Sequence, residues 1–246
     1  MTPRPQSLNE WIDAIGRLSV HEMDLGLERV RRVWKRLHTG RPRARVVTIA
    51  GTNGKGTCAH FIDRTLRAAG KRTGLYTSPH LLRFNERIRI DGRAIDDADL
   101  VRAFERVEQA RRTEPLTFFE FTTLAALVAF ARRPLDVVIL EVGLGGRLDA
   151  VNVIDPDVAI VTRIGLDHMD YLGTTLEAIG REKAGIFRRG VPAVVCRDDA
   201  PRSVMQTARR VGARLIRRGA GIDVHETNER FDWRMDGDVC RDLPRP

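Results

Sequence analysis

A glycine-rich segment with a single lysine is the part of this sequence best suited to carry chemistry. A β-branched run over residues 45–50 leads into it, and a helical pattern over 57–69 follows it. Backbone N–H groups in such a loop, and at the start of the helix behind it, point at phosphate oxygens. We therefore expect an ATP-binding loop formed by Gly51, Thr52, Asn53, Gly54, Lys55, Gly56 and Thr57.

The spacing within this loop differs from the common P-loop pattern G-x-x-x-x-G-K-[ST]. Ile49 stands where the first glycine belongs, and Gly56 is inserted between Lys55 and Thr57. In the expected arrangement Lys55 lies along the β- and γ-phosphates, and the Thr57 hydroxyl meets the accompanying metal ion. A glycine-rich turn with an incidental lysine is the alternative, which the strand–loop–helix context disfavours.

Three further side chains follow predicted elements at positions where chemistry is possible. Glu141 ends an apolar run, where a carboxylate can hold a cation that bridges phosphate oxygens; a turn or helix-capping carboxylate is the alternative. His168 follows the apolar run 158–162 through a short loop, and a structural histidine is its default interpretation. Lys183 lies in a helix that starts with the capping-box pattern of residues 174–177, where a surface lysine is the default.

Segments with strand and helix patterns alternate along most of the chain, and the order of these elements predicts the fold class. Strands are expected at 45–50, 73–76, 135–140, 158–162 and 193–196, and helices at 57–69, 97–113 and 119–131. This alternation predicts an α/β fold with a mostly parallel sheet and helices on both faces.

Two segments flank the alternating region. Residues 7–37 carry two apolar stripes at helical spacing, which predict a helical arm over 1–43. The tail 223–246 is polar and lacks a clear period, so it is expected to be a partial linker toward a further domain. The ATP-binding domain itself is expected over 44–222.

The glycine-rich loop resembles that of the Mur ligase superfamily, and the glycine after the lysine indicates the folylpolyglutamate synthase and dihydrofolate synthase branch. Other segments that resemble this family follow in the family's order over nearly the whole chain. They are residues 24–29, 77–80, 84–88, 117–120, 140–149, 166–168 and 181–187. The resemblance implies a P-loop-containing domain of the Mur ligase central type, with the helical arm on the pterin side.

The resemblance also implies roles for particular residues. Lys55, His168 and Lys183 would be catalytic, and Lys183 would be carbamylated by carbon dioxide. Two Mg²⁺ ions would have the protein ligands Ser78, Glu141, His168 and the carbamylated Lys183. The pocket for the pterin or folate would be lined by Asp24, Leu25, Gly26, Leu27, Thr117, Phe118, Phe119, Glu120, Leu148, Asp149 and Ala150. Val151 departs from the family, which commonly has threonine at that position.

The implied reaction joins L-glutamate to dihydropteroate, or to the γ-carboxylate of a folate, through an acyl phosphate formed from ATP. The small-molecule partners would thus be ATP, L-glutamate and the pteroyl compound, and the full-length protein would be a monomer. One alternative is a truncated remnant or fragment that binds ATP and pterin without ligase activity. Another is a different Mur-type amide ligase, which Gly56 and the pterin-pocket segments disfavour.

Composition limits the remaining classes of protein. The chain has 246 residues and a net charge of +9, but its arginines alternate with acids and no aromatic-interleaved basic patch accompanies them. A nucleic-acid-binding protein is therefore disfavoured. No segment resembles a signal peptide or reaches membrane-spanning length. The three cysteines lack CxxC spacing, which favours a cytoplasmic protein without a zinc site or disulfide framework.

Overall fold

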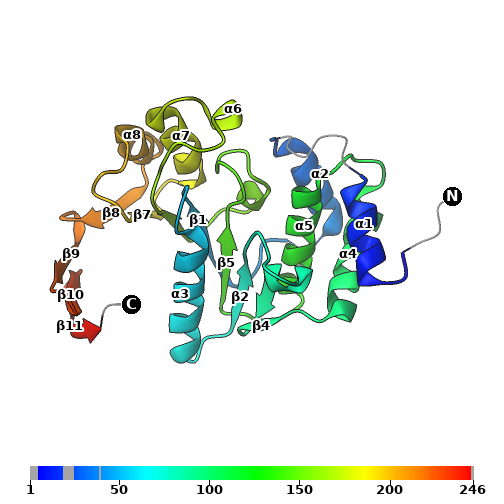
Figure 1. Ribbon diagram of the computed structural model, residues 1–246, viewed down its shortest axis with the longest axis horizontal. Coiled ribbons are helices and arrows are strands. Elements are labelled where there is room, and N and C mark those ends of the chain that lie inside the picture. The colour runs from blue at the N-terminus through cyan, green and yellow to red at the C-terminus, as the bar shows by residue number, and fades with distance from the viewer. Residues whose placement is uncertain (1–4, 19–24, 39, 245–246) are drawn as a thin grey trace.

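The fold is built on one long sheet that runs across the molecule (Figure 1). The computed structural model describes residues 5–18, 25–38 and 40–244. The sheet has 11 strands in the order β11-β10-β9-β8-β7-β6-β1-β5-β2-β3-β4. Its six middle strands, from β8 to β2, pair in parallel. The expected α/β fold with a mostly parallel sheet is confirmed.

All but one of the six middle strands lie where the sequence predicted a strand, within two residues at each end. The six strands are β1 (Arg45–Ala50), β2 (Thr73–Tyr76), β5 (Val137–Glu141), β6 (Val158–Val161), β7 (Pro192–Val195) and β8 (Arg214–Arg218). The sequence analysis did not predict β8. In β1 every residue after Arg45 is buried, as expected for a parallel strand covered on both faces.

Alternation along β1 divides the core between the two faces of the sheet. Val47 and Ile49 pack in a small cluster with residues of helix α3 (Lys55–Ala68). Val46 and Ala50 belong to the large cluster on the other face, which includes helix α5 (Phe118–Ala131). Because successive side chains of a strand point to opposite faces, both faces must be covered. The expectation of helices on both faces is confirmed.

Helix α5 is the centre of the larger core. Its residues from Glu120 to Phe130 are all buried, as its continuous apolar sequence predicted. Around it pack α1 (Leu8–Gly16), α2 (Glu28–Leu37) and α4 (Asp97–Arg111). The expected apolar stripes of the arm supply Trp11 and Val33 to the same core.

Helices α7 (Leu176–Lys183) and α8 (Arg202–Val211) pack against each other beyond β6. The predicted capping box of residues 174–177 is wrong in its register. Thr175, one residue later, caps α7 by accepting from the N–H of Ala178. The Glu177 carboxylate instead accepts from the backbone N–H groups at the start of α8, so it stabilises a different helix from the one predicted.

The segment for which no period was found forms three antiparallel strands. They are β9 (Gly221–Glu226), β10 (Arg230–Met235) and β11 (Asp238–Pro244), which extend the sheet beyond β8. The short elements that complete the described fold are η1 (Phe84–Arg87), β3 (Ile88–Ile90), β4 (Arg93–Ala94), η2 (Ala150–Val153), α6 (Met169–Leu172) and η3 (Ala184–Ile186).

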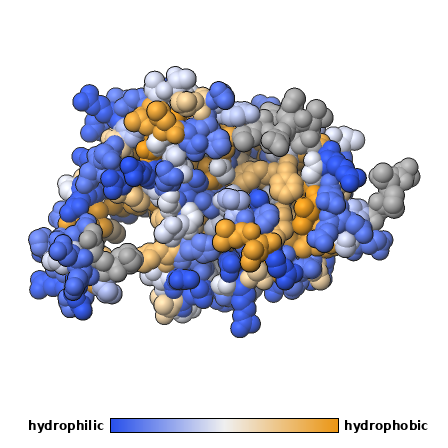
Figure 2. Space-filling model, viewed as in Figure 1, coloured by the Kyte–Doolittle hydropathy of each residue, from blue (hydrophilic) through white to orange (hydrophobic). Residues whose placement is uncertain are grey.

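The surface drawn in Figure 2 is mostly hydrophilic, with separate apolar areas. Among the described residues, the most exposed large hydrophobics are Leu81 and Leu82, at 90% and 89%. No helix in the described part of the chain is both long enough and apolar enough to cross a membrane.

Candidate nucleotide and substrate site

The glycine-rich loop connects β1 to α3 at the carboxyl edge of the sheet, as its sequence predicted. Gly54 caps α3 with a left-handed backbone (φ 83°), and no side chain bonds to the helix start. The first N–H groups of α3 are therefore available to an anion. Lys55, the first residue of the helix, holds its amine 3.2 Å from the carbonyl oxygen of Thr52. The loop and its lysine form one compact positive site.

The loop is held against the segment that follows β6. Thr52 and Asn53 both direct their backbone N–H groups to the carbonyl oxygen of Arg163. The Thr162 hydroxyl donates to the carbonyl oxygen of Asn53 at 2.9 Å. A Cβ on Gly51 would lie 1.9 Å from that hydroxyl oxygen, so only glycine fits there. This close packing holds the glycine-rich loop, the candidate phosphate loop, in one position.

Glu141 stands beside the loop as predicted. It is the last residue of β5 and pairs in register with Ile49 of β1. Its two carboxylate oxygens would each lie 3.6 Å from a Cβ on Gly56. The backbone N–H of Ser78 donates to one of them at 3.1 Å. Burial raises the pKa of Glu141, against the lowering effects of that hydrogen bond and of Lys55.

Lys183 also reaches the loop, from the last turn of α7. Its amine donates to the carbonyl oxygen of Gly51 at 2.9 Å, and the residue is only 4% exposed. Burial, with the nearby charge of Lys55, lowers the pKa of Lys183 to about 8. The default interpretation as a surface lysine is wrong, because this lysine is in the core under the phosphate loop.

Among the described residues, His168 forms no hydrogen bond or ion pair with the glycine-rich loop. It precedes α6 with a left-handed backbone (φ 47°), and its side chain is 43% exposed. The imidazole Nε2 lies 3.7 Å from a carboxylate oxygen of Asp167. Within the described ranges, no three His, Cys, Asp or Glu side chains converge as a metal site would require. The residues present fit a cation held by Glu141 together with phosphate oxygens, since Mg²⁺ keeps several non-protein ligands.

The segment predicted to bind the pterin starts α5. Thr117 caps the helix, and Glu120 completes a capping box with it. The Glu120 carboxylate also accepts from the Arg29 guanidinium of α2 at 2.7 and 2.8 Å. Both carboxylate oxygens are therefore engaged within the protein.

The aromatic and acidic members of the same predicted pocket lie nearby. The Phe119 ring lies 6.0 Å from that of Tyr76, and Phe118 lies 5.9 Å from Phe84. Asp149 caps η2 and is buried, which raises its pKa to about 6. Among the other predicted lining residues, Leu25, Gly26 and Leu148 are half-buried, Leu27 and Ala150 are buried, and Asp24 lies outside the described residues.

The comparisons with known proteins agree with this geometry. The sequence matches the Mur ligase middle domain family over residues 49–232. The chain belongs to the Mur ligase family. The expected resemblance to folylpolyglutamate and dihydrofolate synthases is also confirmed. This Mur ligase chain is 45% identical to the dihydrofolate synthase/folylpolyglutamate synthase of Escherichia coli K12 over 246 residues, which are 100% of the chain and 58% of that relative.

Solved structures of similar proteins contain nucleotides. This Mur ligase chain resembles a structure of E. coli FolC in complex with DHPP and ADP, with a TM-score of 0.96 and 45% identity, over 100% of the chain and 59% of that protein. It also resembles a bifunctional folylpolyglutamate synthase/dihydrofolate synthase with Mn, AMPPNP and L-glutamate bound. There the TM-score is 0.91 and the identity 46%, over 100% of the chain and 60% of the other.

The sequence analysis missed two contacts of this Mur ligase chain that support the candidate site. Thr162 supports the phosphate loop, but it looked only like the end of a strand. Arg29 pairs with Glu120 across 91 positions of the sequence. The helical spacing of the arm and the capping pattern of α5 were both visible, yet neither indicates which helices meet.

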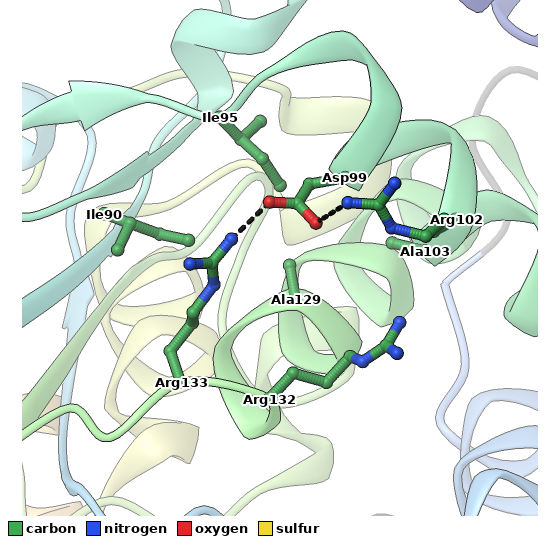
Figure 3. Close-up of a pocket in the computed structure, with 8 residues that line it drawn as sticks. All are labelled: Ile90, Ile95, Asp99, Arg102, Ala103, Ala129, Arg132 and Arg133. Carbon is green, nitrogen blue, oxygen red and sulfur yellow. Dashed lines mark hydrogen bonds and ion pairs between the residues drawn. The ribbon is translucent and has the colours of Figure 1, made fainter.

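A separate cavity of about 230 Å³ lies elsewhere in the Mur ligase domain. Figure 3 shows Arg102 and Arg133 reaching Asp99 at its wall. The cavity borders the C-terminal end of α5 at Ala129, whereas the predicted pterin segment is at the opposite end of that helix. It is therefore distinct from the phosphate loop and its neighbours.

Proposed function

We propose that this chain provides the ATP-binding and pterin-binding part of a ligase that adds L-glutamate to dihydropteroate or to a folate γ-carboxylate. The observation that carries the proposal is the position of Lys55 and Glu141 at one loop. A lysine and free helix N–H groups bind phosphates, and the buried carboxylate of Glu141, beside Gly56 at the same loop, binds a cation there. The names of the nucleotide-bound and glutamate-bound relatives support the same assignment.

In the proposed reaction, a carboxylate oxygen of the pteroyl substrate attacks the γ-phosphorus of ATP, and ADP leaves. The amine of L-glutamate then attacks the carbonyl carbon of the acyl phosphate, and inorganic phosphate leaves with formation of the amide. Lys55 and the first N–H groups of α3 bind the phosphates and offset their negative charge. Phe118 and Phe119 orient the aromatic part of the substrate.

Mg²⁺ would be held by Glu141, with Ser78 and His168 as the further protein ligands of a two-ion site. When bound, the metal supplies positive charge at the oxygens of the transferring phosphoryl group. The Ser78 N–H already positions the Glu141 carboxylate in the protein. His168 would contribute from the residue before α6, where its imidazole is exposed.

Lys183 would join this set only after modification. In its free form it is a cation or a neutral amine that donates to Gly51, and neither form supplies the oxygen ligand that Mg²⁺ prefers. Its lowered pKa of about 8 favours the neutral amine, whose nitrogen can bond to the carbon of carbon dioxide with release of a proton. The product is a carbamate with one negative charge beside the phosphate loop.

The decisive experiment measures phosphate release that depends on both dihydropteroate and L-glutamate, together with ATP affinity in the presence of Mg²⁺. Lys55→Ala should abolish turnover and weaken ATP binding, while Lys71→Ala, at an exposed lysine beyond α3, should leave both unchanged. A folded wild-type chain without affinity for Mg-ATP would contradict the proposal. ATP and pterin binding without turnover would support the binding-only alternative.

A further inference from the structure

Arg87, at the end of η1, lies in an environment that the proposed roles do not explain. Its guanidinium carbon lies 5.4 Å from the centre of the Phe84 ring and 5.6 Å from that of Phe118. Its Nε donates to Nδ1 of His80 at 2.9 Å. Two aromatic faces and an imidazole therefore hold the guanidinium in one orientation.

No carboxylate of the described residues forms an ion pair with this guanidinium. The neighbouring Glu86 directs its carboxylate to the backbone N–H groups of residues 81–83 instead. Burial lowers the pKa of Arg87. By contrast, Arg32 and Arg36 share the carboxylate of Glu114. A half-buried cation without a protein anion indicates a place for an external one.

The hydrogen bond to His80 leaves part of the Arg87 guanidinium unused. The Arg87 Nε donates to Nδ1 of the imidazole. Among the described residues, none accepts a hydrogen bond from the two terminal nitrogens of Arg87, so these donors are available to a ligand.

This pair of residues adjoins the candidate substrate site on two sides. Phe118, under the guanidinium, belongs to the predicted pterin segment at the start of α5. The backbone N–H of Thr77 donates to the carbonyl oxygen of Arg87 at 2.9 Å, and the next N–H, that of Ser78, donates to Glu141. Arg87 therefore lies between the aromatic segment and the strand end that carries Glu141.

We propose that Arg87, held in place by His80, forms a carboxylate subsite that positions the reacting benzoate carboxylate of the pteroyl substrate. The planar guanidinium matches a carboxylate through two parallel hydrogen bonds, which fixes the direction of the group as well as its place. The aromatic surface of Phe118 fits the ring that bears this carboxylate. The subsite rests on the proposed function, since it assigns a contact to the substrate of that reaction.

A carboxylate of L-glutamate fits the same donors. Comparing the affinities of ligands with and without the benzoate carboxylate distinguishes the two carboxylates. The experiment measures the dissociation constants of dihydropteroate, of its analogue with aniline in place of aminobenzoate, and of L-glutamate. The proteins are the wild-type chain, Arg87→Met, Arg87→Lys and the control Arg83→Met, which alters an exposed arginine on the same segment. Mg-ATP affinity and the thermal midpoint report the integrity of the fold.

Arg87→Met should raise the dissociation constant of dihydropteroate by about 10- to 100-fold, the usual effect of losing hydrogen bonds to a charged group. The aniline analogue and L-glutamate should bind this variant as they bind wild type. Arg87→Lys should recover part of the affinity, because it keeps the charge and loses the planar pair of donors. Arg83→Met should behave as wild type with every ligand.

Equal weakening of dihydropteroate and its aniline analogue would overturn the subsite in favour of a purely structural brace. Weaker binding of L-glutamate alone would show that Arg87 binds the amino acid, and it would also overturn the proposed subsite. If Arg87→Met does not fold, Arg87→Gln in the same assay decides, because it keeps hydrogen-bond donors and removes the charge. Failure of wild type to bind any pteroyl compound, with Mg-ATP affinity retained, would overturn the proposed function and this subsite together.

Discussion

The amine of Lys183 donates to the carbonyl oxygen of Gly51, so the end of α7 is tied directly to the first glycine of the phosphate loop. The lysine is buried, and its ordinary counter-ion is replaced by a backbone dipole. Burial of this kind raises the fraction of neutral amine, which is the form that reacts with carbon dioxide.

The first prediction concerns the dependence of stability on pH at Lys183. Its folded pKa of about 8 lies below the ordinary value, so the unfolded chain binds more protons between these two values and stability must rise with pH there. Between pH 7 and 10.5, the unfolding free energy of wild type should rise by about 3 kcal/mol relative to that of Lys183→Met. Urea unfolding of both proteins at several pH values measures the gain, and two parallel pH profiles would contradict it.

The second prediction tests the close packing of the phosphate loop. Gly51→Ala would place a methyl group 1.9 Å from the Thr162 hydroxyl oxygen, which forces the loop to move. Overpacking of this kind costs about 1–3 kcal/mol of unfolding free energy, and ATP affinity should fall as well. Gly165→Ala is the matched control, because its new Cβ would lie 3.7 Å from Thr52. Equal behaviour of the two variants would refute the packing argument.

The third prediction compares a buried ion pair with an exposed one. Glu120→Ala removes the carboxylate that accepts from the half-buried Arg29 guanidinium and that completes the capping box of α5, so its cost in unfolding free energy should exceed that of an exposed pair. Asp199→Ala removes the partner of Arg197 at the surface and should change stability by less than about 1 kcal/mol. Chemical denaturation gives both values. Equal losses in the two variants would contradict the prediction.

The fourth prediction concerns the carboxylate that joins α7 to α8. The N–H groups of Arg202 and Ser203 lower the pKa of Glu177, so its stabilising effect is complete above the ordinary carboxyl pKa and fades as the pH falls through the lowered value. Glu177→Ala should therefore lower the thermal midpoint at pH 7 more than at pH 3. A deficit independent of pH would mean that packing, and not charge, supplies the effect.

Much of the fold could be predicted because the middle strands are buried on both faces. A run such as that of β1 has few alternatives to a central parallel strand. Strands β9, β10 and β11 were missed because most of their side chains are half-buried or exposed. Apolar residues do alternate in β9, at Ile222 and Val224, and in β10, at Phe231, Trp233 and Met235, but these runs are short and the sequence analysis did not use them.

The candidate site was likewise predictable where the signal is local in sequence, and it was not where the contact joins distant residues. The place of the glycine-rich loop between β1 and α3, and that of Glu141 at a strand end, could be predicted because these patterns are visible within a few residues. The position of Lys183 under Gly51 depends on a contact across 132 positions, and only the family resemblance gave it a role. The capping register of α7 was wrong because Thr174 and Thr175 offer the same hydroxyl, and tertiary contacts of Glu177 decide between them.

Helix α7 is anchored at both ends, by Glu177 on α8 and by the ion pair of Glu182 with Arg147. A Cβ on Gly146, in the loop after β5, would lie 2.8 Å from the carbonyl oxygen of Lys183. The last turn of α7 is therefore packed tightly against this loop. A group added to the Lys183 amine would therefore be placed beside the carbonyl oxygen of Gly51, at the first glycine of the loop.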